Sequence, residues 1–253
     1  MRRVREYAEV EHRLRRAAGK ELRQLCVVRG RTLWWLEVGT AANTRAEITL
    51  TGGVHGDEPA GVEAVLRFLE ERPGWAQRVR FTIFPCMNPH GYEHDTRHNH
   101  AGIDLNRQYR DSSVPEVAAQ KRALAGRRFD LHMTLHEDVD ARGFYIYELS
   151  RNNSPVARWI VENVTRLIPF DPRGIIEGRR AQRGVIRRTY PPRDMKQWPE
   201  AIYMFSAHAD HTLTTETPGP FAFEKRVQAQ GLGLRTACEW LASARPRRGA
   251  AGR

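Results

Sequence analysis

The amino-acid sequence predicts an α/β protein with a single-domain mixed, mostly parallel sheet flanked by helices. Residues 46–51 form an apolar run typical of a strand, residues 59–72 have the apolar spacing of a helix, and residues 79–85 form a second strand-like run. A strand, a helix and a strand in this order indicate a parallel βαβ unit. The length of 253 residues and the hydrophobic content of 40% are sufficient for one large core.

The chain before this unit predicts a helix and a hairpin. Residues 3–18 have helical spacing, which would turn four apolar side chains inward: Val4, Tyr7, Val10 and Leu14. Two strand-like runs follow, over residues 23–28 and 32–38, and a short connection around Gly30 joins them. We expect these two runs to form a hairpin that leads into the strand at 46–51.

The rest of the chain predicts strands and helices around two irregular segments, residues 86–113 and 169–208. The first is rich in histidine, asparagine and glycine, and a loop of that length inside a compact domain is usually functional or disordered. The other expected elements are a helix over 115–127, strands over 128–136 and 143–149, a helix over 155–167, a strand over 211–216 and a helix over 223–242. The tail over 245–253 is basic and poor in apolar residues, so we expect it to be disordered.

Composition favours a globular protein of the cytoplasm. No apolar run reaches the roughly 18 residues that a membrane-spanning helix needs. No apolar segment follows the charged start of the chain, so no signal peptide is visible. The three cysteines, Cys26, Cys86 and Cys238, are too few and too scattered for a disulfide framework.

The formal net charge of +11 comes mostly from arginine, and it fits nucleic-acid binding, anionic substrates or an arginine-rich genome. The arginines are spread along the chain and are not gathered on one helix or interleaved with aromatic residues. We therefore do not expect nucleic acid to be the partner. The arginine-rich stretch from Arg173 to Arg193 fits either a lid over an anionic substrate or a solvated flap.

His55 and Glu58 form a candidate metal-binding pair. They lie three residues apart on the loop between strand 46–51 and helix 59–72, at the sheet edge where open α/β sheets bind ligands. An imidazole nitrogen and a carboxylate oxygen are ordinary zinc ligands, and a catalytic zinc site has about three protein ligands and an open position for water. The alternative for such a pair is a solvated surface position.

The third ligand should come from the end of a neighbouring strand. His132 and His136 both lie in the run over 128–136, where alternation puts them on one face with Asp130 and Thr134. We prefer His136 because it is nearer the end of the strand, and we interpret His132 as a hydrogen-bonded histidine inside the sheet.

Further motifs follow His55 and Glu58 in a fixed order. They are Asn88-Pro-His-Gly91, Arg97, Gly102-Ile-Asp-Leu-Asn106-Arg107, Leu135-His136 and Thr215-Glu216-Thr217. This order, over residues 48–217, resembles the zinc carboxypeptidase superfamily, including its succinylglutamate desuccinylase and aspartoacylase branch. The resemblance implies a zinc carboxypeptidase-like catalytic domain over residues 1–244, with Zn²⁺ bound by His55, Glu58 and His136.

The resemblance also implies roles for the other matched residues. Glu216 would be the general base that takes a proton from the attacking water and delivers it to the leaving nitrogen. Arg97 would stabilise the oxyanion of the tetrahedral intermediate. Asn106 and Arg107 would hold the carboxylate of the substrate. Asp104 would be a structural acceptor that fixes the loop.

The sequence departs from the family pattern in four places. The loop between Asn106-Arg107 and His136 is short compared with the peptidases and closer to the deacylases in compactness. His90 stands where an acidic residue is usual, which should affect loop packing more than chemistry. Peptidases of this type use a mobile tyrosine, for which Tyr190 and Tyr203 are candidates outside any matching motif; we assign Tyr203 to substrate binding. Only 37 residues follow Glu216, too few for the extra carboxyl-terminal β domain of the deacylases.

We therefore expect a zinc-dependent hydrolase that cleaves an amide bond beside a free carboxylate. A carboxypeptidase-like activity on small peptides is the first choice, and the missing β domain favours it. A deacylase of N-acyl amino acids is the alternative, because both chemistries need the same zinc, base and arginines. A non-catalytic protein that uses its basic surface to bind nucleic acid or an acidic partner is the alternative of another class. The sequence leaves the oligomeric state open.

Overall fold

The computed structural model describes residues 5–39, 44–111, 113–152, 154–188 and 195–243. One eight-stranded sheet lies at its centre, with the strand order β1, β2, β4, β3, β5, β10, β6, β9. These strands are β1 (Leu22–Val28), β2 (Arg31–Val38), β3 (Ala46–Gly52), β4 (Val79–Phe84), β5 (Leu131–Asp138), β6 (Tyr145–Ser150), β9 (Val185–Arg188) and β10 (His211–Pro218).

The four central strands, β4, β3, β5 and β10, pair in parallel. On one side β2 and β1 continue the sheet as an antiparallel hairpin, which confirms the hairpin expected from the sequence. On the other side β6 pairs antiparallel with β10, and β9 pairs parallel with β6. The prediction of a mixed, mostly parallel sheet is therefore confirmed.

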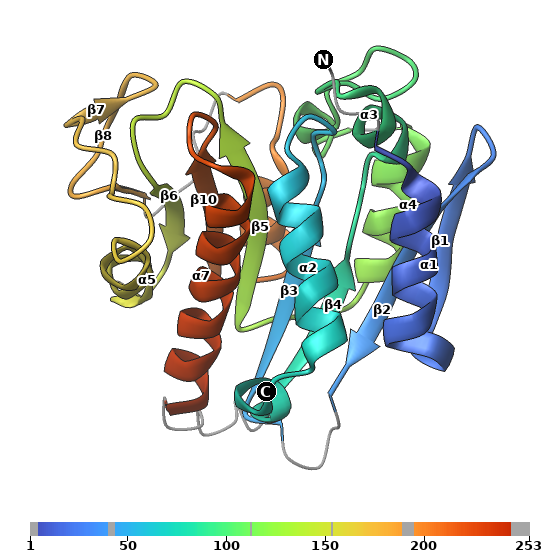
Figure 1. The fold of residues 1–253 in the computed structure, drawn as a ribbon, viewed down its shortest axis with the longest axis horizontal. Coiled ribbons are helices and arrows are strands. Elements are labelled where there is room, and N and C mark those ends of the chain that lie inside the picture. The colour runs from blue at the N-terminus through green and yellow to red at the C-terminus, as the bar shows by residue number, and fades with distance from the viewer. Residues whose placement is uncertain (1–4, 40–43, 112, 153, 189–194, 244–253) are drawn as a thin grey trace.

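Helices cover both faces of the sheet (Figure 1). One face carries α1 (Tyr7–Ala18), α2 (Pro59–Glu71), α5 (Val156–Val164) and α7 (Phe223–Ser243). The opposite face carries α4 (Pro115–Leu124) and α6 (Glu200–Ala207), which pack with a second apolar cluster. The remaining short helices are η1 (Gly19–Glu21), η3 (Gly74–Arg78), α3 (Pro89–His94) and η4 (Leu105–Arg107). Helix α1 buries Tyr7, Val10 and Leu14 as its spacing predicted, and Val4 lies outside the described residues.

The two faces of the central strands differ in polarity, which decides where the site can form. Toward α2 and α7, alternate side chains join the main apolar core, among them Leu50, Met133 and Leu213. Two polar rows cross the opposite face from β3 through β5 to β10, and a third joins β5 to β10. The register of the strands sets these rows as Thr49 with His132 and Thr212, Thr51 with Thr134 and Thr214, and His136 with Glu216.

The prediction of irregular chain over residues 169–208 is wrong for much of that segment. It contains β9, helix α6 and a small hairpin of β7 (Ile175–Ile176) and β8 (Arg179–Arg180). Strands of two residues are too short to show alternation, and the turn between them is marked only by positive φ angles at Glu177 and Gly178. Helix α6 was missed because eight residues span about two turns, too few to show helical periodicity clearly.

The first irregular segment, residues 86–113, also contains short helices. Asn88 caps the start of helix α3: its Oδ1 accepts a hydrogen bond from the backbone N–H of Gly91 at 2.9 Å. Pro89 occupies the first position of the helix. No helix of the described chain is both long and apolar enough to cross a membrane. The predicted basic tail over 245–253 lies outside the described residues.

The loop that carries His55 packs closely against α3. A Cβ atom placed on Gly56 would lie 1.9 Å from the backbone carbon of Gly91, whereas a Cβ atom on Gly74 would meet nothing within 4 Å. Glycine at position 56 therefore lets two backbone segments of the site approach each other.

We predict that Gly56→Ala lowers the free energy of unfolding by about 1–3 kcal/mol or more, because the clash involves backbone that has to shift. Gly74→Ala is the matched control and should change it by less than about 0.5 kcal/mol. Urea unfolding followed by circular dichroism measures both changes. Equal effects of the two substitutions would contradict the close packing of the loop on α3.

Candidate active site

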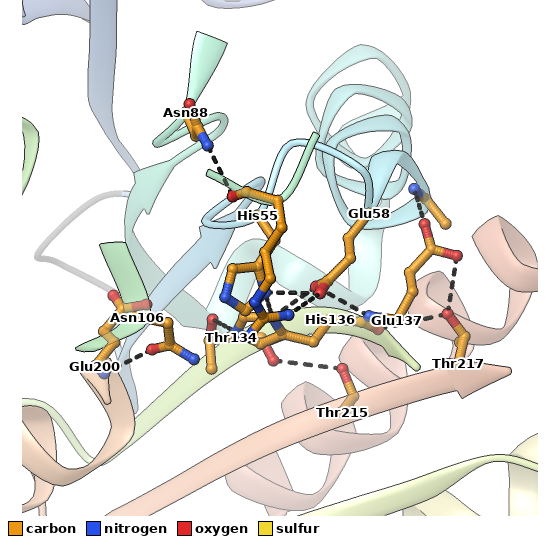
Figure 2. Close-up of polar contacts among 12 residues, drawn as sticks. His55, Glu58, Asn88, Asn106, Thr134, His136, Glu137, Glu200, Thr215 and Thr217 are labelled. Carbon is orange, nitrogen blue, oxygen red and sulfur yellow. Dashed lines mark hydrogen bonds and ion pairs between the residues drawn. The ribbon is translucent and has the colours of Figure 1, made fainter. Parts of the chain in front are cut away.

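Three side chains from separate parts of the chain converge at the carboxyl edge of the sheet (Figure 2). His55 lies on the loop after β3, Glu58 directly precedes α2, and His136 lies near the end of β5. Their potential ligand atoms all lie within 4.8 Å of one another, and all three residues are buried. Glu58 Oε1 is 2.6 Å from His55 Nδ1, and its Oε2 is 2.7 Å from His136 Nδ1.

The outer nitrogen of each histidine is held by an oxygen. His55 Nε2 lies 3.1 Å from Asp104 Oδ1, and His136 Nε2 lies 3.2 Å from Thr134 Oγ1. These contacts leave both Nδ1 atoms facing Glu58. Metal-binding histidines in proteins are commonly oriented in this way by an oxygen on the ring nitrogen that does not bind the metal. Two imidazole nitrogens and one carboxylate form a donor set that fits zinc.

The charges of this cluster stabilise one another. Burial alone would raise the pKa of Glu58, but the neighbouring His136 and His55 lower it. Burial alone would lower the pKa of His55, but Glu58 and the hydrogen bond with Asp104 more than offset this and raise it. A buried carboxylate at this point is thus kept ionised, which is the state that a metal ligand needs.

The structure brings His136 to the pair and leaves His132 inside the sheet. His132 is fully buried, and neither of its nitrogens has a hydrogen-bond partner among the described residues. Its Nε2 lies 4.0 Å from Glu200 Oε1. Burial lowers the pKa of His132 to about 3, so its ring is neutral near pH 7.

Glu216 lies beside His136 on the adjacent parallel strand. It lines a cavity of about 530 Å³ that also contains the three candidate ligands. Burial raises the pKa of Glu216 well above its usual range, and the nearby carboxylates of Glu58 and Asp138 act in the same direction, while His136 opposes them. A divalent cation at the three ligands would add a strong opposing charge and favour the carboxylate form.

Three further predicted residues line the same cavity: Arg97, Asn106 and Arg107. Arg97 is held by a hydrogen bond from its Nε to Asp104 Oδ2 at 3.0 Å, and its Nη1 lies 3.5 Å from Glu58 Oε1. Asn106 Oδ1 accepts a hydrogen bond from the backbone N–H of Glu200 at 2.9 Å. Arg107 donates to the backbone carbonyl of Asn106 at 2.9 Å.

Asp104 has a larger part in this arrangement than the sequence suggested. Its carboxylate contacts both His55 and Arg97 and also accepts a hydrogen bond from the backbone N–H of Asn106 at 2.9 Å. Burial opposes the charged form, but His55 and the arginines lower the pKa of Asp104. One side chain thus orients a candidate metal ligand and the candidate oxyanion donor together.

Tyr203 is not among the residues that line the cavity, and its role in substrate binding stays a prediction. Ala201 and Ile202 of α6 line the cavity, and Tyr203, one helical step further, turns away from it. Its hydroxyl lies 2.9 Å from His208 Nε2, and its ring packs against Tyr109. The other candidate, Tyr190, lies outside the described residues.

The sequence did not predict a set of buried, hydrogen-bonded polar side chains in this part of the fold. Glu200 Oε1 accepts hydrogen bonds from Gln120 and from Thr51, a residue of the polar rows, each at 2.7 Å. Glu137 accepts a hydrogen bond from the first-turn N–H of Ala60 at 2.7 Å and forms an ion pair with Arg226. The repeated threonines of β3, β5 and β10 were a visible signal of a polar sheet face, but no pattern linked them to distant acids.

The arginine-rich stretch after Arg173 reaches the cavity at two described positions, Arg179 of β8 and Arg188 of β9. Asp171 holds Arg173 itself through contacts of 2.6 and 2.8 Å, so that arginine is a structural group. Of these three described arginines, Arg179 and Arg188 line the cavity, and Arg173 holds the structure of its own loop.

Comparisons with known proteins show what the chain is similar to. Residues 27–130 match the family model for zinc carboxypeptidases. Carboxypeptidase SOL1 from Arabidopsis thaliana is 32% identical over 132 residues, which cover 43% of this chain and 27% of the plant protein. The chain thus spans only about a quarter of the length of that relative.

Solved structures extend the similarity to nearly the whole chain. A candidate metallopeptidase from Shewanella baltica has a TM-score of 0.78 at 21% identity, covering 94% of this chain and 92% of that one. Carboxypeptidase A from Helicoverpa armigera has a TM-score of 0.68 at 16% identity, covering 96% of this chain and 74% of that one. The family model over residues 27–130 confirms the resemblance to the zinc carboxypeptidase superfamily, and the solved structures share the fold of nearly the whole chain.

Proposed function

We propose that the protein is a zinc-dependent hydrolase that cleaves the amide bond beside a free carboxylate, as a carboxypeptidase does. One observation carries this proposal: a single cavity is lined by the three candidate ligands, by Glu216 and by Arg97 and Arg107. A metal, a base and two separate guanidinium groups are what hydrolysis of an amide with a carboxylate terminus requires.

In this mechanism the arginines and Asn106 position the substrate. Arg107 and Asn106 bind the terminal carboxylate, for which a guanidinium offers two parallel donors. Arg97, already oriented by Asp104, donates hydrogen bonds to the oxygen that becomes negative when the carbonyl carbon is attacked. Because these donors are fixed before the reaction, little reorganisation is needed as the charge develops.

Glu216 carries the proton in this mechanism. It removes a proton from the attacking water, whose oxygen then bonds to the carbonyl carbon, and it delivers that proton to the amide nitrogen as the carbon–nitrogen bond breaks. Zinc bound by His55, Glu58 and His136 would supply Lewis acidity and lower the pKa of the attacking water. The products are a new carboxylate and a free amine.

A carboxypeptidase activity is preferred to deacylation of N-acyl amino acids. Both proteins compared by name, from Arabidopsis thaliana and Helicoverpa armigera, are carboxypeptidases, which supports the peptide substrate for this chain. Deacylation uses the same groups, so the two activities are separated by their substrates and not by the residues of the cavity.

Metal analysis tests the first step of the proposal. After loading with zinc and removal of the excess, we expect about one zinc per chain in wild-type protein and little in His136→Ala. His132→Gln should keep its zinc, because His132 lies outside the cluster of ligand atoms. Circular dichroism would show whether each variant is folded. Little metal in folded wild-type protein would contradict the proposal and direct attention to the basic surface of the protein.

Glu216→Gln tests the proposed general base. We expect kcat to fall by roughly 10²- to 10⁴-fold, because an amide cannot accept the proton, while the zinc content stays unchanged. Glu177→Gln is the control, since Glu177 lies on the same cavity but has no part in the proton transfer. A Glu216→Gln protein with near wild-type kcat would exclude this role.

A substrate panel tests the carboxylate requirement. Peptides with a free carboxyl terminus should be cleaved at least about tenfold more efficiently than the same peptides with an amidated terminus, and Arg107→Ala should abolish this difference. N-acyl amino acids complete the panel. If only these were hydrolysed, the deacylase activity would replace the carboxypeptidase assignment.

A further inference from the structure

The cavity extends from the candidate ligands along the polar rows toward the edge strand β9. Its floor follows β10 from Glu216 to Thr214, and the next residue on the same face is Thr212. Leu149 of β6 lies beside Thr212, and Arg188 of β9 lies beside Leu149. Arg188 is therefore at the end of the cavity remote from Glu216.

Arg188 is partly exposed there and has no partner in the described chain. No described carboxylate lies within ion-pair distance of its guanidinium, and none of its nitrogens donates a hydrogen bond to a described residue. Its neighbour Arg187 points to the other face of the strand, where Nε contacts Glu148 Oε2 at 2.6 Å. Arg187 is thus paired with Glu148, and Arg188 faces the cavity with no ion-pair partner among the described residues.

The walls near Arg188 are apolar. Leu149 and Ile202 belong to one small apolar cluster, and Ile186 precedes Arg188 on the same face of β9. Ala201 lines the cavity with a small side chain, which leaves room between these walls. A substrate side chain in this part of the cavity would contact apolar side chains along its length and the guanidinium of Arg188 at its tip.

Two carboxylates along the cavity wall accept hydrogen bonds from tyrosines. Asp138 accepts a hydrogen bond from the hydroxyl of Tyr145 at 2.9 Å, and Glu177 accepts one from the hydroxyl of Tyr147 at 2.5 Å. Tyrosines of β6 thus hold both acids, and neither acid forms an ion pair with Arg188 in the described chain.

We propose that Arg188 binds the side-chain carboxylate of the terminal amino acid of the substrate, so that the enzyme prefers glutamate at that position. This inference rests on the proposed function and narrows its substrate class. Arg107 then binds the α-carboxylate and Arg188 the side-chain carboxylate, each as a charge-assisted pair. The terminal amino acid is the same in a peptide and in an N-acyl amino acid, so the preference holds for either substrate class.

Matched substrates test the proposal. Blocked dipeptides that end in glutamate or in glutamine, and N-acetyl-glutamate beside N-acetyl-glutamine, differ only in the charge that Arg188 would recognise. We expect zinc-loaded wild-type protein to favour the glutamate member of the active pair by roughly 10- to 100-fold in kcat/KM. Arg188→Gln should reduce this ratio to near one, and Arg188→Glu should shift the preference toward terminal lysine.

Arg180→Gln is the matched control, because Arg180 is exposed on β8 outside the cavity lining and its loss removes the same net charge. It should keep both the activity and the glutamate preference. Equal use of glutamate and glutamine by wild-type protein, or a preference that survives Arg188→Gln, would overturn the proposal. A new lysine preference in Arg188→Glu shows that the variant is folded and that residue 188 contacts the side chain of the terminal amino acid of the substrate.

Direct binding separates a failure of this inference from a failure of the proposed function. Isothermal titration of the protein with N-acetyl-glutamate and N-acetyl-glutamine needs no turnover. Tighter binding of the glutamate compound that depends on Arg188 supports the inference even if no substrate is hydrolysed, and that result would count against the hydrolase alone. Equal binding of the two compounds counts against Arg188.

Discussion

The parallel pairing of β5 with β10 is the constraint on which the site depends. It places Glu216 beside His136, and it leaves the polar residues of both strands on one face of the sheet. β3 pairs with the other side of β5, so the loop that carries His55 and Glu58 emerges at the same edge. A shift of one residue in this register would turn His136 into the apolar core and Glu216 away from the cavity.

Holding these charges in a buried place requires partners that the strands alone do not supply. Asp104 orients His55 and Arg97 together, and Thr134 holds the outer nitrogen of His136. On the other face, Gln230 of α7 donates to the backbone carbonyl of His136 at 2.8 Å. Buried carboxylates are stable only when they are hydrogen-bonded or paired with a cation, and most acids near this site have such partners.

The sequence predicted the central fold and most of the cavity because both rest on local patterns. The βαβ unit follows from hydrophobic spacing, and the order of the motifs placed His55, Glu58, His136 and Glu216 in one site. Glu200 and Gln120 could not be predicted in this way, because each contacts Thr51 from a distant helix and neither stands in a recognisable motif. The sequence could not show that Tyr203 lies outside the cavity lining, because the side that it faces depends on how α6 packs, and α6 is too short to show a clear apolar periodicity.

The strand order has a consequence for how this protein matures. β10 lies between β5 and β6, although both of those strands precede it by more than 60 residues in the chain, so the centre of the sheet closes only after the carboxyl-terminal part has been made. Contacts between such distant segments form slowly, because a long loop has to close before they add stability. A nascent chain that already carries His55, Glu58 and His136 still lacks Glu216, the proposed general base, and the strand that places it beside His136.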